Sequence, residues 1–296
     1  MEPTASIPER VNHQDAARAA VPQTAVFVAT LRAFESDKEP NDRLFFDPWA
    51  KVLVGGEKWL KTSADKMLWG GSSKRDFWID FLAARTRWID DSISARVVAA
   101  PELQVVVLGA GLDTRAYRLE SLRSKPVFEV DFAEVLEAKQ TILSGGTTPA
   151  EPLAKRAAVA ADFSDGSWRD SLVAAGFNTL RPSLWLLEGL SGYLTGMELD
   201  QLFEGISELS TDGSRTIQTY LGEGMRHTQD VTNMHHFYVR NKAHLSEFME
   251  NHGWMVHGVH NIGTVADSYG RSGNIPDGYE YYLLDAAWEP ALPQSQ

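Results

Sequence analysis

The strongest constraint on the fold is a short apolar run, residues 104–108, that leads directly into Gly109-Ala110-Gly111. The run is too short for an ordinary helix and too uniformly apolar for a half-exposed strand, so it predicts a buried parallel strand. The two glycines indicate a turn where the backbone approaches a ligand, because glycine has no Cβ to block the approach. Residues 114–122 can then begin a helix. This order predicts a ligand site at the carboxyl edge of an α/β sheet.

The class of ligand follows from the residues around this turn. A dinucleotide-binding loop needs a third glycine three residues after the second, and Thr114 occupies that position. A second predicted strand, residues 127–130, is followed by Asp131, whose carboxylate could accept hydrogen bonds from both hydroxyls of a ribose. A nucleoside without a pyrophosphate therefore fits better than NAD, and S-adenosylmethionine is the common ligand of that kind. The alternative is a buried strand followed by an ordinary glycine turn.

The rest of the chain alternates between predicted strands and helices, which is typical of a parallel sheet with helices on both faces. Strands are expected at residues 157–161, 183–187 and 216–221, and helices at residues 132–143, 168–175, 196–209 and 244–252. The last two predicted strands, residues 254–259 and 279–286, have no long crossover helix between them, so we expect an antiparallel edge.

About a hundred residues precede the first strand, and their apolar spacing predicts three helices. These cover residues 23–34, 45–54 with Asp47 as N-cap and Pro48 at the first helical position, and 76–100. We therefore expect an N-terminal arm and helical cap over residues 1–100. A ligand-binding domain is expected over residues 101–296, with an insertion near the site around residues 222–242.

Composition excludes several classes of function. The 296-residue chain has a net charge of −12, which argues against nucleic acid as a partner because such binding depends on neutralising phosphates. It contains no cysteine, which excludes disulfides, thiolate nucleophiles and Cys-ligated zinc. No apolar segment suits a signal peptide or a membrane span, so we expect a soluble cytoplasmic protein with no membrane partner.

The histidines crowd into the last third of the chain, but no pair has the zinc spacing of a metalloprotease helix. We therefore expect no metal site. One histidine, in residues 225–240, could serve as a base near the substrate.

Taken together, these motifs resemble those of the leucine carboxyl methyltransferase family, and within it the bacterial and fungal S-adenosylmethionine-dependent O-methyltransferases of secondary metabolism. The resemblance covers residues 20–290, approximately. It is carried by Ala84-Arg85-Thr86-Arg87, Leu108-Gly109-Ala110-Gly111-Leu112-Asp113-Thr114-Arg115 with Arg118-Leu119, Phe128-Glu129-Val130-Asp131-Phe132, Asp162-Phe163, and Glu188-Gly189-Leu190 with Tyr193-Leu194. Many relatives have an apolar residue before the tyrosine, where this chain has Ser191-Gly192.

The resemblance implies a Rossmann-like α/β methyltransferase fold, with a seven-stranded sheet, helices on both faces and a reversed final hairpin. It also implies that Arg85 pairs with the methionine carboxylate of the cofactor, a task suited to a guanidinium. Gly109 and Gly111 admit the methionine part, and Asp131 takes the ribose hydroxyls.

Three more residues have implied roles in holding the cofactor. Asp162 bonds the adenine amino group, Phe163 lies beside it as a wall, and Glu188 contacts the amino or sulfonium side. Asp113 could either belong to the site or cap the next helix, and Arg115 and Arg118 are expected only to form salt bridges on that helix.

Methyl transfer to a carboxylate needs alignment of acceptor, methyl and sulfur but no base, because the acceptor is already ionised at neutral pH. The prediction is therefore an O-methyltransferase acting on a carboxyl group of a small molecule. A phenol acceptor would need a base, and Tyr193 is the candidate catalytic residue. Two alternatives stay open: a nicotinamide-dependent oxidoreductase, and a methyltransferase-like binding protein without turnover. Neither the acceptor nor the oligomeric state is predicted.

Overall fold

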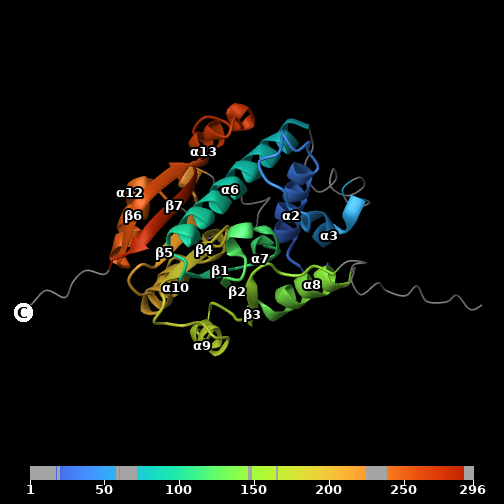
Figure 1. Cartoon of the computed structure of the whole chain (residues 1–296). Helices are drawn as coiled ribbons and strands as arrows, with labels where there is room; N and C mark the ends of the chain where they lie inside the picture. Colours follow the sequence, from blue (N-terminus) through green and yellow to red (C-terminus); the bar gives the residue numbers. More distant parts are fainter. Residues whose placement is uncertain are drawn as a thin grey trace, which may run out of the picture.

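The computed structural model describes residues 18, 21–57, 60, 72–145, 149–164, 166–224 and 239–289. Its centre is a seven-stranded sheet in the order β3-β2-β1-β4-β5-β7-β6 (Figure 1). The strands are β1 (Gln104–Leu108), β2 (Pro126–Asp131), β3 (Lys155–Ala160), β4 (Ser183–Leu187), β5 (Arg215–Leu221), β6 (Trp254–Asn261) and β7 (Tyr281–Trp288).

The first five strands pair in parallel, and β7 pairs antiparallel with both β5 and β6. The predicted reversed hairpin is therefore confirmed. The reversed strand is not at the edge, however, because β7 lies between β5 and β6.

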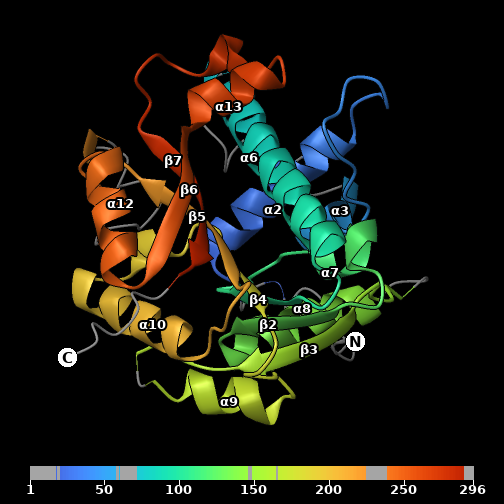
Figure 2. The same ribbon diagram turned by 60° about the vertical axis from the view of Figure 1, so that its left-hand side comes forward.

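Helices cover both faces of the sheet, as predicted (Figure 2). One face carries α2 (Gln23–Ser36), α3 (Ala50–Val54), α6 (Ser72–Ala99), α7 (Arg115–Arg118) and α8 (Ala133–Ser144). The other carries α9 (Trp168–Ala174), α10 (Gly196–Glu208) and α12 (Lys242–Asn251). A further helix, α13 (Ile262–Ser268), packs against α6, and short 3-10 helices lie at η1 (Glu120–Leu122), η2 (Ser191–Tyr193) and η4 (Ser272–Asn274).

Strand β1 is buried along its whole length, which is what its uniformly apolar sequence predicts. Val105 and Val107 face the helices that include α6, while Val106 and Leu108 face α9 and α10. The long helix α6 contributes to the same core as β1, so the N-terminal helices form part of the helical layer on one face of the sheet. The division of the chain at residue 100 stays a prediction.

Some elements differ from the sequence-based expectation. The helix expected over residues 45–54 is only α3, and its N-cap is Trp49 rather than Asp47, so Pro48 lies before the helix. Asp47 still accepts hydrogen bonds from the backbone N–H groups of Trp49 and Ala50, at 3.0 Å each. The helix expected over residues 114–122 is divided into α7 and η1. The insertion expected around 222–242 falls largely on residues 225–238, which lie outside the described residues.

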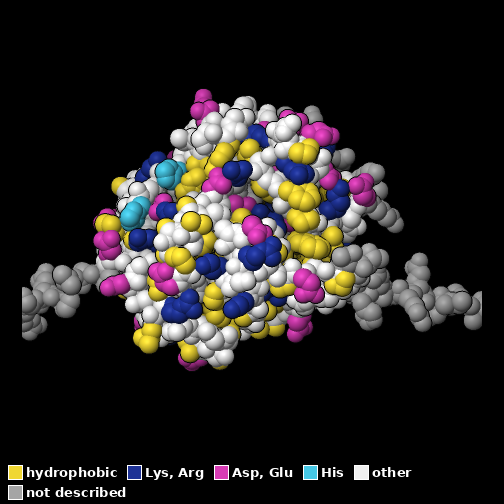
Figure 3. Space-filling view, viewed as in Figure 1, with side chains coloured by type: hydrophobic (Ala, Val, Ile, Leu, Met, Phe, Trp, Pro, Cys, Tyr) yellow, Lys and Arg dark blue, Asp and Glu magenta, His cyan; other side chains and the backbone are white. Residues whose placement is uncertain are grey.

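The face of the molecule in Figure 3 carries cationic and anionic side chains interspersed with apolar ones. Among the described residues, no helix combines the length and the hydropathy that are needed to cross a bilayer.

Two glycines of α10 offer a matched test of its packing against α9. A Cβ added at Gly205 would lie 2.7 Å from Cζ2 of the buried Trp168 ring, whereas one added at Gly196 meets nothing within 4 Å. We expect Gly205→Ala to lower the free energy of unfolding by roughly 1–3 kcal/mol, despite the better helix propensity of alanine. Gly196→Ala should leave it unchanged or slightly raised. Urea unfolding measures both, and equal effects would contradict this packing.

Candidate cofactor site

The site lies where the strand order changes direction. From β1 the chain crosses to β2 and β3 on one side, then returns to place β4 on the other side of β1. The loops that follow β1 and β4 therefore diverge, and such a switch point is where α/β sheets bind ligands. The predicted site residues Gly109 and Glu188 follow these two strands directly.

The glycine turn is bonded to the acid after β2. Gly109 and Gly111 both have positive φ, +67° and +44°, a region that favours glycine. The backbone N–H of Gly111 donates to Asp131 Oδ2 at 2.6 Å, and that of Phe132 donates to Asp131 Oδ1 at 2.7 Å. Each carboxylate oxygen keeps a second lone pair, so Asp131 can still accept from two hydroxyls.

The environment of Asp131 does not favour its ionised form. Burial raises the pKa of Asp131 above its usual value, and the two backbone N–H groups offset only part of this effect. Additional hydrogen-bond donors would stabilise the carboxylate, and the diol of a ribose provides them. A carboxylate left under-stabilised at a strand end is typical of a binding site.

Arg85 and Glu188 lie together on the β4 side of the switch point. Arg85 comes from α6, is 6% exposed, and has its Nε 2.9 Å from Glu188 Oε1. Its Nη1 also donates to the hydroxyl of Tyr281 at 3.1 Å. The structure thus brings together two predicted site residues that are far apart in sequence, and it adds Tyr281, which the sequence analysis missed.

Tyr193 lies close to this pair on η2. Its hydroxyl is hydrogen-bonded to Thr24 of α2, and burial raises its pKa. The tyrosine therefore stays protonated at neutral pH, able to donate a hydrogen bond but not to remove a proton. The neighbouring Ser191, where the sequence departs from many relatives, is buried and donates to the carbonyl oxygen of Thr219 at 3.2 Å.

Asp162 and Phe163 follow β3, which pairs with β2. Asp162 is exposed, and its Oδ1 accepts a hydrogen bond from the backbone N–H of Ser164 at 2.9 Å. A cavity of ≈ 280 Å³ opens beside Phe163 and Ser164, and is lined further by residues of α9 and α10. These residues thus continue the same edge of the sheet beyond Asp131.

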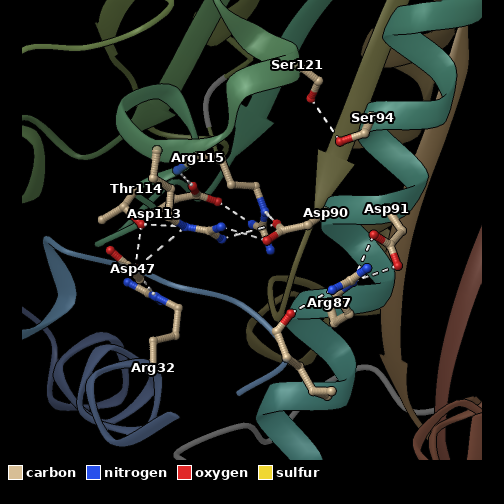
Figure 4. Close-up of polar contacts among 12 residues, drawn as sticks. Arg32, Asp47, Arg87, Asp90, Asp91, Ser94, Asp113, Thr114, Arg115 and Ser121 are labelled. Atoms are coloured by element: carbon tan, nitrogen blue, oxygen red, sulfur yellow. Dashed lines mark hydrogen bonds and ion pairs between the residues drawn. The ribbon is translucent and has the colours of Figure 1, made fainter. Parts of the chain in front are cut away.

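A network of buried ion pairs lies behind the site (Figure 4). Arg115 contacts three carboxylates: its Nε lies 2.7 Å from Asp90 Oδ1, and its Nη1 lies 2.6 Å from Glu188 Oε2 and 2.5 Å from Asp113 Oδ2. Arg118 binds the other oxygen of Asp90 at 2.6 Å. The expectation that both arginines only form salt bridges on their own helix is therefore wrong, because both reach α6.

The residues that sequence reasoning missed share one property: their partners are distant in the chain. Tyr281 looks like an ordinary core residue of a strand, and nothing in its neighbourhood indicates Arg85. Asp90 and Arg115 could have been recognised from the sequence. Each lies next to apolar residues of a predicted helix, and a charge that is buried with them needs a partner of the opposite sign. Among the described residues, no group of three or more His, Asp or Glu is arranged to hold a metal ion.

The strand order, the reversed strand β7 and the glycine turn beside Asp131 define a Rossmann-like fold of the methyltransferase class. A protein from Streptomyces avermitilis, described as belonging to the duf574 family, has this fold with a TM-score of 0.60 at 15% identity, over 91% of this chain and 98% of that one.

Sequence comparisons then define the family. The model of the family "Leucine carboxyl methyltransferase" matches residues 25–207. A Mycobacterium tuberculosis protein is 34% identical over 80% of this chain and 81% of its own length, and a Rhodococcus jostii protein is 35% identical over 86% and 88%. Both are named "Putative S-adenosyl-L-methionine-dependent methyltransferase". The chain belongs to the leucine carboxyl methyltransferase family.

The ion network predicts how stability depends on pH. Burial, the largest single effect, raises the pKa of Asp113, but Arg115, Lys139 and Arg32 together outweigh it, and the pKa falls from 3.8 to about 2. A depressed pKa in the folded state gives stability that is complete above pH 3.8 and is lost as the pH falls toward 2. Asp113→Asn should therefore lower the free energy of unfolding at pH 7 by roughly 2 kcal/mol, and by progressively less between pH 3.8 and 2.

Urea unfolding over this pH range measures the effect, with Asp91→Asn as the control. Asp91 is 48% exposed and pairs with Arg87 on the surface of α6, so its replacement should change the free energy of unfolding by about 0.5 kcal/mol or less. If Asp113→Asn lowered the free energy of unfolding by the same amount at pH 7 and at pH 2, the assigned ion pair would be contradicted.

Proposed function

We propose that the protein is an S-adenosylmethionine-dependent O-methyltransferase that methylates a carboxyl group of a small molecule. The methyltransferase class and the cofactor, S-adenosylmethionine, follow from membership of the family and agree with the sequence prediction. The observation that carries the rest is the pairing of two subsites across one switch point. Asp131 with the glycine turn suits a ribose, and the Arg85–Glu188 pair suits an amino acid.

The residues fit the two ends of this cofactor. The methionine end carries a carboxylate and an ammonium, and Arg85 and Glu188 offer one charge of the opposite sign to each. In our proposal the nucleoside extends over Gly109 and Gly111 to Asp131, and the adenine reaches the edge formed by Asp162 and Phe163. Bound there, the cofactor supplies a methyl group activated by a sulfonium sulfur.

The protein's part in the transfer is alignment and exclusion of water. A carboxylate oxygen of the acceptor forms the new bond to the methyl carbon as the sulfur–methyl bond breaks, and no proton moves. Tyr193 fits this chemistry, because its raised pKa keeps the hydroxyl protonated. Its role in the proposal is to position the acceptor by a hydrogen bond.

Aromatic side chains next to Arg85 support an acceptor with an apolar body. Their rings pack edge-to-face against one another, and the ring centroids of Phe81 and Tyr281 lie 5.9 Å from Arg85 Cζ. These side chains are Phe27, Phe77, Trp78, Phe81, Tyr279 and Tyr281. Residues 225–238 of the insertion that we expected near the site lie outside the described residues.

The alternative of a nicotinamide-dependent oxidoreductase has one observation against it. Thr114, which stands where a dinucleotide loop needs its third glycine, is buried and donates a hydrogen bond to Asp47 Oδ2 at 2.6 Å. The third glycine of such a loop lets the helix pack closely on the strand, and the side chain of a threonine takes up that space.

Cofactor binding is tested by calorimetry with S-adenosylhomocysteine. We expect binding to the wild type and a loss of about tenfold or more for Asp131→Ala, because two charge-assisted hydrogen bonds to the ribose disappear. Asp212→Ala is the control, since Asp212 is an exposed acid just before β5, at the opposite edge of the sheet. Absence of heat with the wild type would refute the proposed function.

The acceptor class is tested with aromatic carboxylic acids and the matched phenols. A carboxylate ionises near pH 4, so methyl transfer should be nearly independent of pH from about 6 to 9. The product should be an ester that dilute alkali hydrolyses. An alkali-stable ether, or a rate that climbs toward the phenol pKa of about 10, would show that the acceptor is a phenol instead.

A further inference from the structure

Arg115 occupies a position that the proposed cofactor contacts do not explain. It is a buried cation, 4% exposed, on the four-residue helix α7 that follows the glycine turn. Its guanidinium reaches Asp90 on α6 and Glu188 at the end of β4, and so joins a helix to the switch point. Burial of three carboxylates around one guanidinium is expensive unless the geometry is well satisfied.

Glu188 is held from both sides by arginines. Its Oε1 lies 2.9 Å from Arg85 Nε, and its Oε2 lies 2.6 Å from Arg115 Nη1. A free Arg–carboxylate pair prefers a bidentate arrangement, with both oxygens on one guanidinium. Because Arg115 binds Oε2, only Oε1 of Glu188 turns toward Arg85. We call this single-oxygen arrangement an open pair, and the bidentate arrangement a closed pair.

An open pair matters because the charged groups of the cofactor must bind to Arg85 and Glu188. The amino-acid end carries its ammonium and carboxylate on neighbouring carbons, and each needs one member of the Arg85–Glu188 pair. A closed bidentate pair would satisfy both residues internally and compete with the ligand.

We propose that Arg115 is a positioning residue for the amino-acid end of the cofactor, which it serves by holding Glu188 away from a closed pair with Arg85. This inference rests on the proposed function. Arg115 itself does not touch the cofactor in this scheme, and its effect on the amino-acid end is transmitted through Glu188.

Arg118 provides a matched control within the same helix. Its side chain is 5% exposed, against 4% for Arg115, and both bind Asp90. Arg118 differs in that its other polar contacts are with Asp47 and Thr114 rather than with Glu188. The variants Arg115→Met and Arg118→Met therefore remove similar buried charges. Only the first releases Glu188, and it also releases Asp113.

The test measures binding of two probes by calorimetry: S-adenosylhomocysteine, and 5′-methylthioadenosine, which lacks the amino-acid end. We expect Arg115→Met to weaken S-adenosylhomocysteine by about tenfold or more and to leave 5′-methylthioadenosine within about twofold. Arg118→Met should leave both affinities within about twofold. Added to Glu188→Gln, the Arg115→Met change should cost no further affinity, because the two residues act as one unit.

The inference is overturned if Arg115→Met weakens the binding of both probes equally. It is also overturned if Arg115→Met and Arg118→Met change the affinity for S-adenosylhomocysteine by the same factor. If Arg115→Met does not fold, Arg115→Lys decides: it keeps the charge but cannot contact all three carboxylates, so it should weaken only S-adenosylhomocysteine. Failure of the wild type to bind S-adenosylhomocysteine would instead refute the proposed function.

Discussion

The change of strand order between β1 and β4 is the constraint on which the site depends. The two strands are neighbours in the sheet, but the helices that follow them pack on opposite faces. The carboxyl ends of both strands are therefore left uncovered at one point. Leu190 packs there against the turn, since a Cβ added at Gly109 would lie 3.1 Å from its Cδ1. Backbone and side chains of both loops thus fix the shape of this edge.

Charge as well as apolar packing joins the N-terminal helices to this edge. In the described residues the network pairs four guanidinium groups with four carboxylates, so it is close to neutral as a whole. Its members are Arg32, Arg85, Arg115 and Arg118 with Asp47, Asp90, Asp113 and Glu188. A well-packed apolar set of the same volume could be equally stable, so what such a network contributes beyond stability is fixed relative orientation. That property suits α6, which carries Arg85.

Much of this fold was predictable because its signals are local. An apolar run ending in Gly109 specifies a buried strand and a turn, and Asp131 follows the next strand at the same edge. The contacts of Arg115 and Tyr281 were not predictable, because Glu188 lies 73 residues from Arg115, and Arg85 lies 196 residues from Tyr281. Helix α13 was missed for a different reason: its short sequence contains glycine and β-branched residues, and packing of Val265 and Ala266 against α6 outweighs their weak propensity. The roles of the site residues stay predictions.

The position of β7 has a consequence for how the chain reaches its native state. β7 is the last strand in the sequence, yet it lies inside the sheet and is the strand through which β6 joins β5. During synthesis, β1 to β5 can assemble before it emerges, but they would expose the open edge of β5 until then. Tyr281, the hydroxyl partner of Arg85, arrives with the same strand. The candidate site would therefore acquire this contact only after β7 has been synthesised.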